Sequence, residues 1–170
     1  MLSLEIQSLR EFTQLLFTRD TFDSWQVLEA AVSSFSDLYI DGHTNPEFFA
    51  ESEQTPPRFC SWGRLRPACF AYIRGKVMPL SFRISFVIPA QDARSLPGGS
   101  AALSADDQND YTVLLSYKNH SLSLTTGILE STSELSFSRD SLSLRRENQK
   151  AFDRFLCLFL DSLGIGWAVR

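Results

Sequence analysis

Hydrophobic and polar residues alternate along several short stretches of the chain, as expected for strands with one buried face. The clearest stretch covers residues 80–88, where large apolar residues occupy every second position and smaller or charged residues lie between them. The same reasoning predicts strands over residues 2–6, 25–33, 35–41, 80–88, 111–117, 121–126 and 134–138. Several of these strands are joined by short polar turns, which is typical of antiparallel hairpins.

Other stretches have the spacing of helices with one apolar face, and they are predicted over residues 9–16, 66–74 and 144–163. Ser8 and Glu11 have the spacing of a capping box at the start of the first helix. Because proline lacks the N–H that a helix interior needs, Pro67 is placed at the start of the second helix. Gly75 and Gly164 are placed where the second and third helices end.

The predicted elements follow one another in the order β-α-β-β-α-β-β-β-β-α, with an exposed loop that contains some helical turn over residues 95–110. Strands that arrive in runs favour an α+β fold, with mainly antiparallel sheet or sheets and two to three helices. Units of a helix followed by several strands resemble, in topology, the domains of DNA processivity clamps. We expect residues 1–170 to form a single domain with one hydrophobic core. Asn45-Pro46 has the pattern of a helix cap followed by proline at the first helical position.

Composition agrees with an ordinary globular protein, because 44% of the residues are hydrophobic, 21% are charged and the net charge is −4. Three cysteines without CxxC spacing indicate reduced thiols rather than a disulfide framework. The N-terminal residues lack the pattern of a secretory signal, and the most apolar stretch is too short to span a membrane. We therefore expect a cytoplasmic protein that does not contact a membrane.

Motifs for cofactor chemistry are missing from the sequence. It has no glycine-rich phosphate loop and no GxSxG, and its histidines and cysteines do not have metal-ligand spacing on one element. We therefore predict no cofactor and no metal.

Asp41-Gly42-His43 gives the one weak candidate for catalysis, at the end of a predicted strand. A carboxylate two residues from an imidazole can orient the ring, as a general base requires. The same residues are also ordinary turn formers, because glycine supplies unusual backbone angles. A small hydrolase that uses Asp41 and His43 with a nearby serine or cysteine is therefore the alternative function.

Charge is distributed unevenly along the chain. Residues 1–53 hold ten acidic and two basic residues, whereas residues 54–91 hold six basic residues and no acidic one. Arginine side chains interleaved with aromatic ones are suited to phosphates, carboxylates and stacked rings. The candidate binding residues in this block are Trp62, Arg64, Arg66, Arg74 and Lys76. The same block could instead pack against the acidic N-terminal third of its own chain.

Short motifs along the chain resemble a family of small bacterial proteins with no assigned function. They are Asp41-Gly42-His43, Ser61-Trp62 with Leu65-Arg66-Pro67, Pro79-Leu80-Ser81-Phe82 and Thr125-Thr126-Gly127. The resemblance covers nearly the whole chain and implies a stand-alone bacterial protein of the cytoplasm. It brings no activity, cofactor or catalytic residue.

These observations favour a non-enzymatic interaction module that uses a basic, aromatic-rich surface around residues 58–83. The expected partner is another protein or a second copy of the chain, and nucleic acid is a further possibility. Overall acidity disfavours non-specific nucleic-acid binding by the whole surface.

Overall fold

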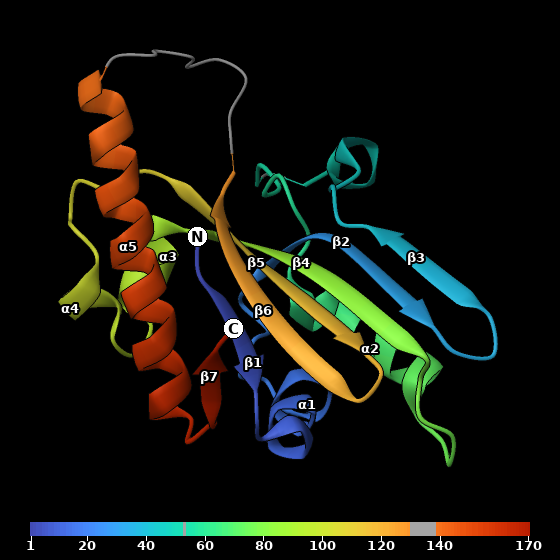
Figure 1. Cartoon of the computed structure of the whole chain (residues 1–170). Helices are drawn as coiled ribbons and strands as arrows, with labels where there is room; N and C mark the ends of the chain where they lie inside the picture. Colours follow the sequence, from blue (N-terminus) through green and yellow to red (C-terminus); the bar gives the residue numbers. More distant parts are fainter. Residues whose placement is uncertain (53, 130–138) are drawn as a thin grey trace.

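The computed structural model describes residues 1–52, 54–129 and 139–170 of the chain (Figure 1). The strands are β1 (Ser3–Ile6), β2 (Gln26–Ser33), β3 (Asp37–Asp41), β4 (Ser81–Pro89), β5 (Asp110–Lys118), β6 (Ser121–Ile128) and β7 (Trp167–Val169). The helices are α1 (Leu9–Thr18), α2 (Trp62–Ile73), α3 (Ala90–Ser95), α4 (Gly99–Ala102), α5 (Arg139–Ser162) and the 3₁₀ helix η1 (Pro46–Phe49). The α+β class is therefore confirmed.

All seven strands form one antiparallel sheet in the order β3-β2-β4-β5-β6-β1-β7. The register places apolar residues opposite one another from strand to strand. One such row crosses six strands through Ile40, Ala30, Ile84, Leu115, Leu124 and Leu4. Side chains of the next row, including Arg83, Ser116 and Ser123, point to the other face. The sheet therefore has one apolar and one polar face.

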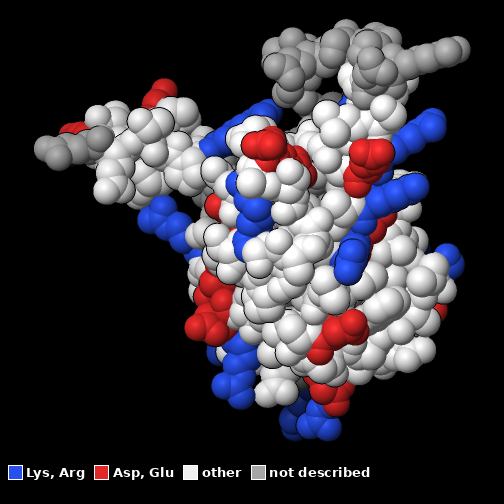
Figure 2. Space-filling view, turned by 90° about the vertical axis from the view of Figure 1, so that its left-hand side faces the viewer, with Lys and Arg blue, Asp and Glu red and all other residues white. Residues whose placement is uncertain are grey.

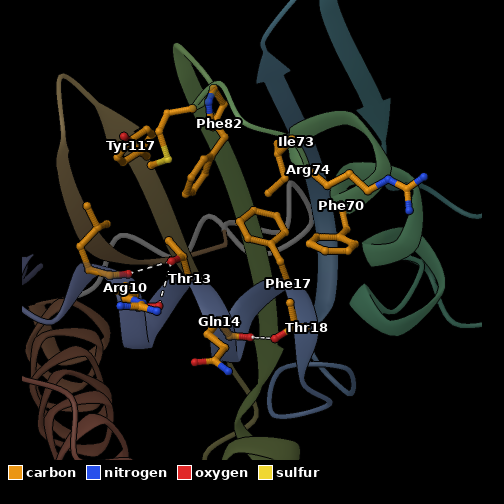
Figure 3. Close-up of a pocket in the computed structure, with 14 residues that line it drawn as sticks. Arg10, Thr13, Gln14, Phe17, Thr18, Phe70, Ile73, Arg74, Phe82 and Tyr117 are labelled. Atoms are coloured by element: carbon orange, nitrogen blue, oxygen red, sulfur yellow. Dashed lines mark hydrogen bonds between the residues drawn. The ribbon is translucent and has the colours of Figure 1, made fainter.

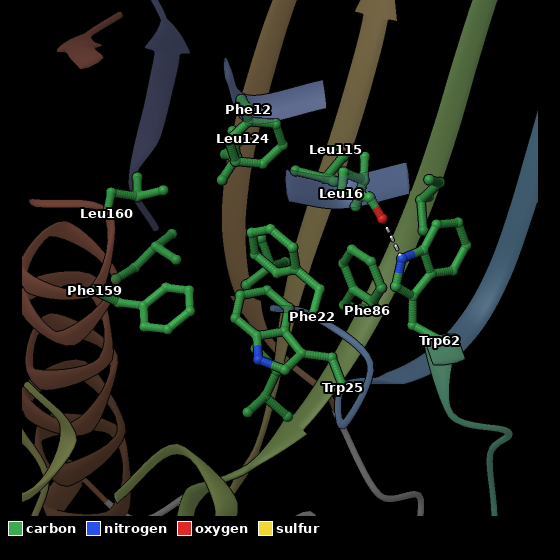
Figure 4. Close-up of a cluster of buried hydrophobic side chains, with 14 of the residues drawn as sticks. Phe12, Leu16, Phe22, Trp25, Trp62, Phe86, Leu115, Leu124, Phe159 and Leu160 are labelled. Atoms are coloured by element: carbon green, nitrogen blue, oxygen red, sulfur yellow. Dashed lines mark hydrogen bonds between the residues drawn. The ribbon is translucent and has the colours of Figure 1, made fainter. Parts of the chain in front are cut away.

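The long helices pack on the apolar face of this sheet. Phe17 of α1 contacts Phe82 at a ring separation of 5.3 Å, and Phe152 of α5 stacks on Tyr111 at 4.1 Å. Buried side chains from β1, β2, β4, β5, β6, α1, α2 and α5 join in one connected core, part of which is shown in Figure 4. No helix in the described ranges combines the length and the apolar character needed to cross a membrane.

The start of α2 differs from the prediction, because the helix begins at Trp62 and Pro67 lies inside it. The first backbone N–H groups of α2 have acceptors elsewhere: Trp62 donates to the Trp25 carbonyl and Gly63 to the Asp23 carbonyl. The Trp62 side chain is fully buried, and its Nε1 donates to the Leu16 carbonyl at 2.8 Å (Figure 4). These tertiary contacts outweigh the loss of one hydrogen bond at Pro67.

The helix ends show one confirmed and one wrong prediction. The C-terminal end of α5 forms a Schellman motif, in which Gly164 has a φ of +69° and Ile165 N–H donates to the Leu160 carbonyl. The capping box at Ser8 is not formed. The Ser8 hydroxyl instead accepts a hydrogen bond from Gly166 N–H, which holds the C-terminal segment against the start of α1.

Two further differences concern the element order. The described residues contain five α-helices rather than two to three, because short helices α3 and α4 form between β4 and β5. Helix α4 lies within the loop in which some helical turn was expected. The three-residue strand β7 was not predicted, since it pairs with β1 only through the turn at Gly164. The predicted strand over residues 134–138 lies outside the described residues.

Two buried tryptophans allow a test of the Trp62 hydrogen bond. Trp25 is equally buried, but its Nε1 has no hydrogen-bond partner in the described part of the chain. Both Trp→Phe substitutions remove the same ring volume, but only Trp62→Phe leaves a buried carbonyl unpaired, which costs roughly 1–3 kcal/mol. We expect urea unfolding to show Trp62→Phe less stable than Trp25→Phe by about that amount. Equal losses would contradict this role for Trp62.

Candidate functional site

An open groove runs between α1 and the C-terminal half of α2, above the ends of β4 and β5 (Figure 3). Its volume is about 470 Å³, which falls within the range of protein binding pockets. Buried aromatic rings of Phe17, Phe82 and Tyr117 form its floor. Its walls are apolar as well and include half-buried Phe70 and Ile73 of α2.

The rim of the groove is polar and carries only positive charge. Arg10 of α1 and Arg74 at the end of α2 are its charged residues, and none of the residues that line it is acidic. Figure 3 shows the Arg74 side chain extending outward from the rim rather than toward the floor. The Thr13 and Thr18 hydroxyls donate to carbonyls of α1 itself. The groove is therefore suited to an apolar group with a negative charge beside it.

Apolar surface continues beyond the groove along the loop that joins α2 to β4. Met78 lines the groove and is 58% exposed, and its neighbours Val77 and Leu80 are 82% and 69% exposed. Exposed Phe35, in the turn between β2 and β3, stacks on Tyr72 of α2 at a ring separation of 4.8 Å. Contiguous exposed apolar residues of this kind mark interaction sites in soluble proteins.

The predicted basic surface is only partly assembled. Trp62 is buried and contributes nothing to a surface, so its assignment as a binding residue is wrong. The Arg66 guanidinium forms two hydrogen bonds of 2.8 Å with Asp23 and a third with the Phe17 carbonyl. Arg64 is exposed at the first turn of α2 and lies over the Phe49 ring. Of Trp62, Arg64, Arg66 and Arg74, only Arg74 borders the groove.

Lys76 completes the predicted set, and it is exposed two residues after Arg74 in the loop beside the groove. Sequence reasoning missed the other side of the groove, which comes from Arg10 and neighbouring residues of α1. The run of apolar residues 77–80 between a helix and a strand is the signal that could have located it.

Asp41 and His43 do meet, at the end of edge strand β3. His43 Nδ1 lies 2.6 Å from Asp41 Oδ1, and the His43 backbone N–H also donates to this oxygen. These contacts, the backbone one first, hold the pKa of the Asp41 carboxyl below its ordinary value. Within the described residues, no hydroxyl or thiol lies within hydrogen-bond distance of the ring. The hydrolase function stays a prediction without an observed nucleophile.

The chain matches the model of a known protein family. The model of DUF5721, described as a family of unknown function, matches residues 15–168. The chain belongs to DUF5721. The predicted resemblance to a family without an assigned function is therefore confirmed. No curated protein and no solved structure matches the DUF5721 chain, so the likeness to clamp domains stays a prediction.

For two of the motifs behind the resemblance, the structure of the DUF5721 chain explains why particular residues occur at their positions. A Cβ atom at Gly42 would lie 1.7 Å from the Val27 carbonyl oxygen, so only glycine fits between Asp41 and His43. Trp62 and Arg66 of the second motif both donate to carbonyls in the last turn of α1. Packing therefore accounts for Gly42, Trp62 and Arg66 in these motifs.

The thiols of the DUF5721 chain are not arranged for metal binding. All three cysteines are free, and no group of three or more metal-ligating side chains occurs among the residues described. Burial raises the pKa of the Cys69 thiol to about 11. Because the thiolate is the reactive form, this cysteine is a poor nucleophile at neutral pH.

This environment predicts the labelling of Cys69. In the native protein at neutral pH, we expect iodoacetamide to leave Cys69 unmodified, since the thiol is both buried and protonated. In urea the same residue should react fully, as mapped by peptide mass spectrometry. Rapid native labelling of Cys69 would contradict the packing of α2 against the sheet.

The ion pair with Asp23 gives a prediction for Arg66. Arg66→Gln should lower the free energy of unfolding by about 1–2 kcal/mol, because it removes charge-assisted hydrogen bonds of a partly buried pair. The matched variant Arg74→Gln should change it by less than about 0.5 kcal/mol, as is usual for exposed residues. Unchanged stability of Arg66→Gln would mean that Arg66 is free to contact a partner.

Proposed function

We propose that this DUF5721 chain is a non-enzymatic binding module whose groove takes an apolar segment of a partner protein with acidic side chains beside it. The groove carries the proposal, because it combines an aromatic floor with a rim whose charges are all positive. Such a rim favours carboxylates, which arginine pairs with well. Arg74 and Lys76 retain the role predicted for them from the sequence.

The surroundings of the groove favour a protein over a small molecule. A small ligand that fills the groove would leave Val77 and Leu80 in water, whereas a protein partner covers them together with the groove. Removing apolar surface from water contributes a favourable free energy of roughly 25 cal/mol per Å². The partner that gains most is therefore one that continues past Met78 onto this loop.

A protein partner also fits the positions of the basic residues better than nucleic acid does. A phosphate backbone needs cations distributed along a continuous track. In this chain Arg66 is paired with Asp23, and Arg64 and Arg74 lie ten residues apart at the two ends of α2. Nucleic-acid binding is therefore kept as an outcome of the test rather than as the proposal.

The bacterial cytoplasm, implied by the family resemblance, is part of the same proposal. Three free cysteines support a reducing compartment. The proposed partner surface, lined with arginine and apolar side chains, does not require a membrane.

The proposal can be tested by selecting peptides from a random phage library on the immobilised wild-type chain. We expect the enriched peptides to combine large apolar residues with acidic ones. Met78→Asp and Arg74→Glu should each weaken their binding about tenfold or more, which corresponds to about 1.4 kcal/mol. The melting temperature should stay unchanged, because both residues are exposed.

Matched controls come from α5. Leu144 is 57% exposed, nearly as much as Met78, and Arg154 is an exposed arginine. Leu144→Asp and Arg154→Glu should leave peptide binding unchanged. Peptides that bind all four variants as well as wild type would overturn the proposed function. So would DNA that is retained by the immobilised chain when no peptide is enriched.

A further inference from the structure

A short arm projects from the sheet between β3 and α2. It comprises residues 44–52, and Thr44 closes its base by pairing with the Arg58 carbonyl at 3.1 Å. Figure 1 shows the arm in teal above β2 and β3, and Figure 2 shows it standing out from the body of the molecule. Such an arm is accessible to another molecule.

The arm has a defined local structure. The Asn45 side chain accepts a hydrogen bond from Glu47 N–H, and Pro46 occupies the first position of η1. Phe49 lies under the Arg64 guanidinium of α2 at 5.7 Å, which fixes the arm to its own chain. The neighbouring ring of Phe48 is 75% exposed. One aromatic residue therefore anchors the arm and the next is presented to solvent.

The charges of the arm are opposite to those of the groove. Glu47 and Glu51 are exposed on either side of Phe48, and no lysine or arginine occurs from residue 20 to residue 57. The groove offers an aromatic floor between Arg10 and Arg74. The arm thus carries the features that the proposed function requires of a ligand: a large apolar side chain with carboxylates beside it.

We infer that the arm binds the groove of a second copy of the chain, with Phe48 entering the groove and Glu47 and Glu51 near Arg10 and Arg74. This inference rests on the proposed function and names the partner. The arm cannot fill its own groove, because it is fixed at the first turn of α2 while the groove begins at the last turns. Arg64, which holds the arm, precedes Arg74 at the rim of the groove by ten residues, or about 15 Å along the helix.

Two copies can exchange arms reciprocally. Each chain has one arm and one groove, so a two-fold dimer satisfies both contacts and leaves neither apolar surface exposed. The contact includes ion pairs at an exposed rim, so added salt should weaken it.

Light scattering coupled to size-exclusion chromatography tests the inference over concentrations of about 1 to 100 µM, where a weak dimer dissociates. The wild-type mass should rise with concentration from the chain mass of 19.2 kDa toward twice that value. Phe48→Ala and Met78→Asp should each remain monomeric with unchanged melting temperatures. The control Leu144→Ala should dimerise as wild type does.

Mixing the two monomeric variants provides the sharper result. Phe48→Ala retains an intact groove and Met78→Asp retains an intact arm, so an equimolar mixture can form one of the two contacts. We expect a heterodimer in the mixture, weaker than the wild-type dimer, detected with one chain fluorescently labelled. A mixture in which both chains remain monomeric would overturn the arm–groove pairing.

Failure of this inference is distinguishable from failure of the proposed function. A wild-type chain that stays at 19.2 kDa, or a dimer that Phe48→Ala leaves intact, would overturn the inference. Enrichment of groove-dependent peptides from the phage library would in that case still support the proposed function. If the chain neither dimerises through the arm nor enriches groove-dependent peptides, both the inference and the proposed function are overturned.

Discussion

The last turn of α1 has carbonyl groups that its own helix cannot satisfy, as at any helix C-terminus. Two side chains of α2 satisfy them. Trp62 Nε1 donates to the Leu16 carbonyl, and one turn later Arg66 donates to the Phe17 carbonyl. The positive charge of Arg66 also suits this end of the α1 dipole. The two helices are thereby held to each other as well as to the sheet.

The position of the groove follows from this contact. Trp62 also lies against Phe17 and Phe86, at ring separations of 5.9 Å and 5.6 Å, so that α1, α2 and β4 meet at one point. Beyond this point the C-terminal half of α2 and the outer side of α1 leave the ends of β4 and β5 partly uncovered, and the groove forms there. A buried polar contact thus determines where an apolar surface stays open.

The uneven charge of the chain has two structural explanations. Arg66 is neutralised by Asp23, so part of the basic block packs on the acidic N-terminal third of the chain. Arg74 and Lys76 remain exposed beside the groove, while Glu47 and Glu51 remain exposed on the arm. Arg74 and Lys76 thus lie at the C-terminal end of α2, whereas Glu47 and Glu51 lie on the arm that contacts Arg64 at its N-terminal end.

The strands could be predicted well from the sequence, because alternation over residues 80–88 or 111–117 directly reflects one buried face. The start of α2 could not, because Pro67 marks a helix start by local rules and the contacts of Trp62 override them. The start of the short helix in the arm could be predicted from Asn45-Pro46, whereas the groove could not. Arg10 and Arg74 lie far apart in sequence, and only the packing of α1 beside α2 brings them to one rim.

The central claim is that the groove positioned by Trp62 binds the arm of a second copy of the chain. It is tested most directly by NMR, with ¹⁵N-labelled Phe48→Ala chain titrated with a synthetic peptide of residues 44–52. We predict the largest amide shift changes in α1, in the last turn of α2 and over residues 75–80. Changes centred on the polar face of the sheet, or none at peptide concentrations of about 1 mM, would contradict the claim.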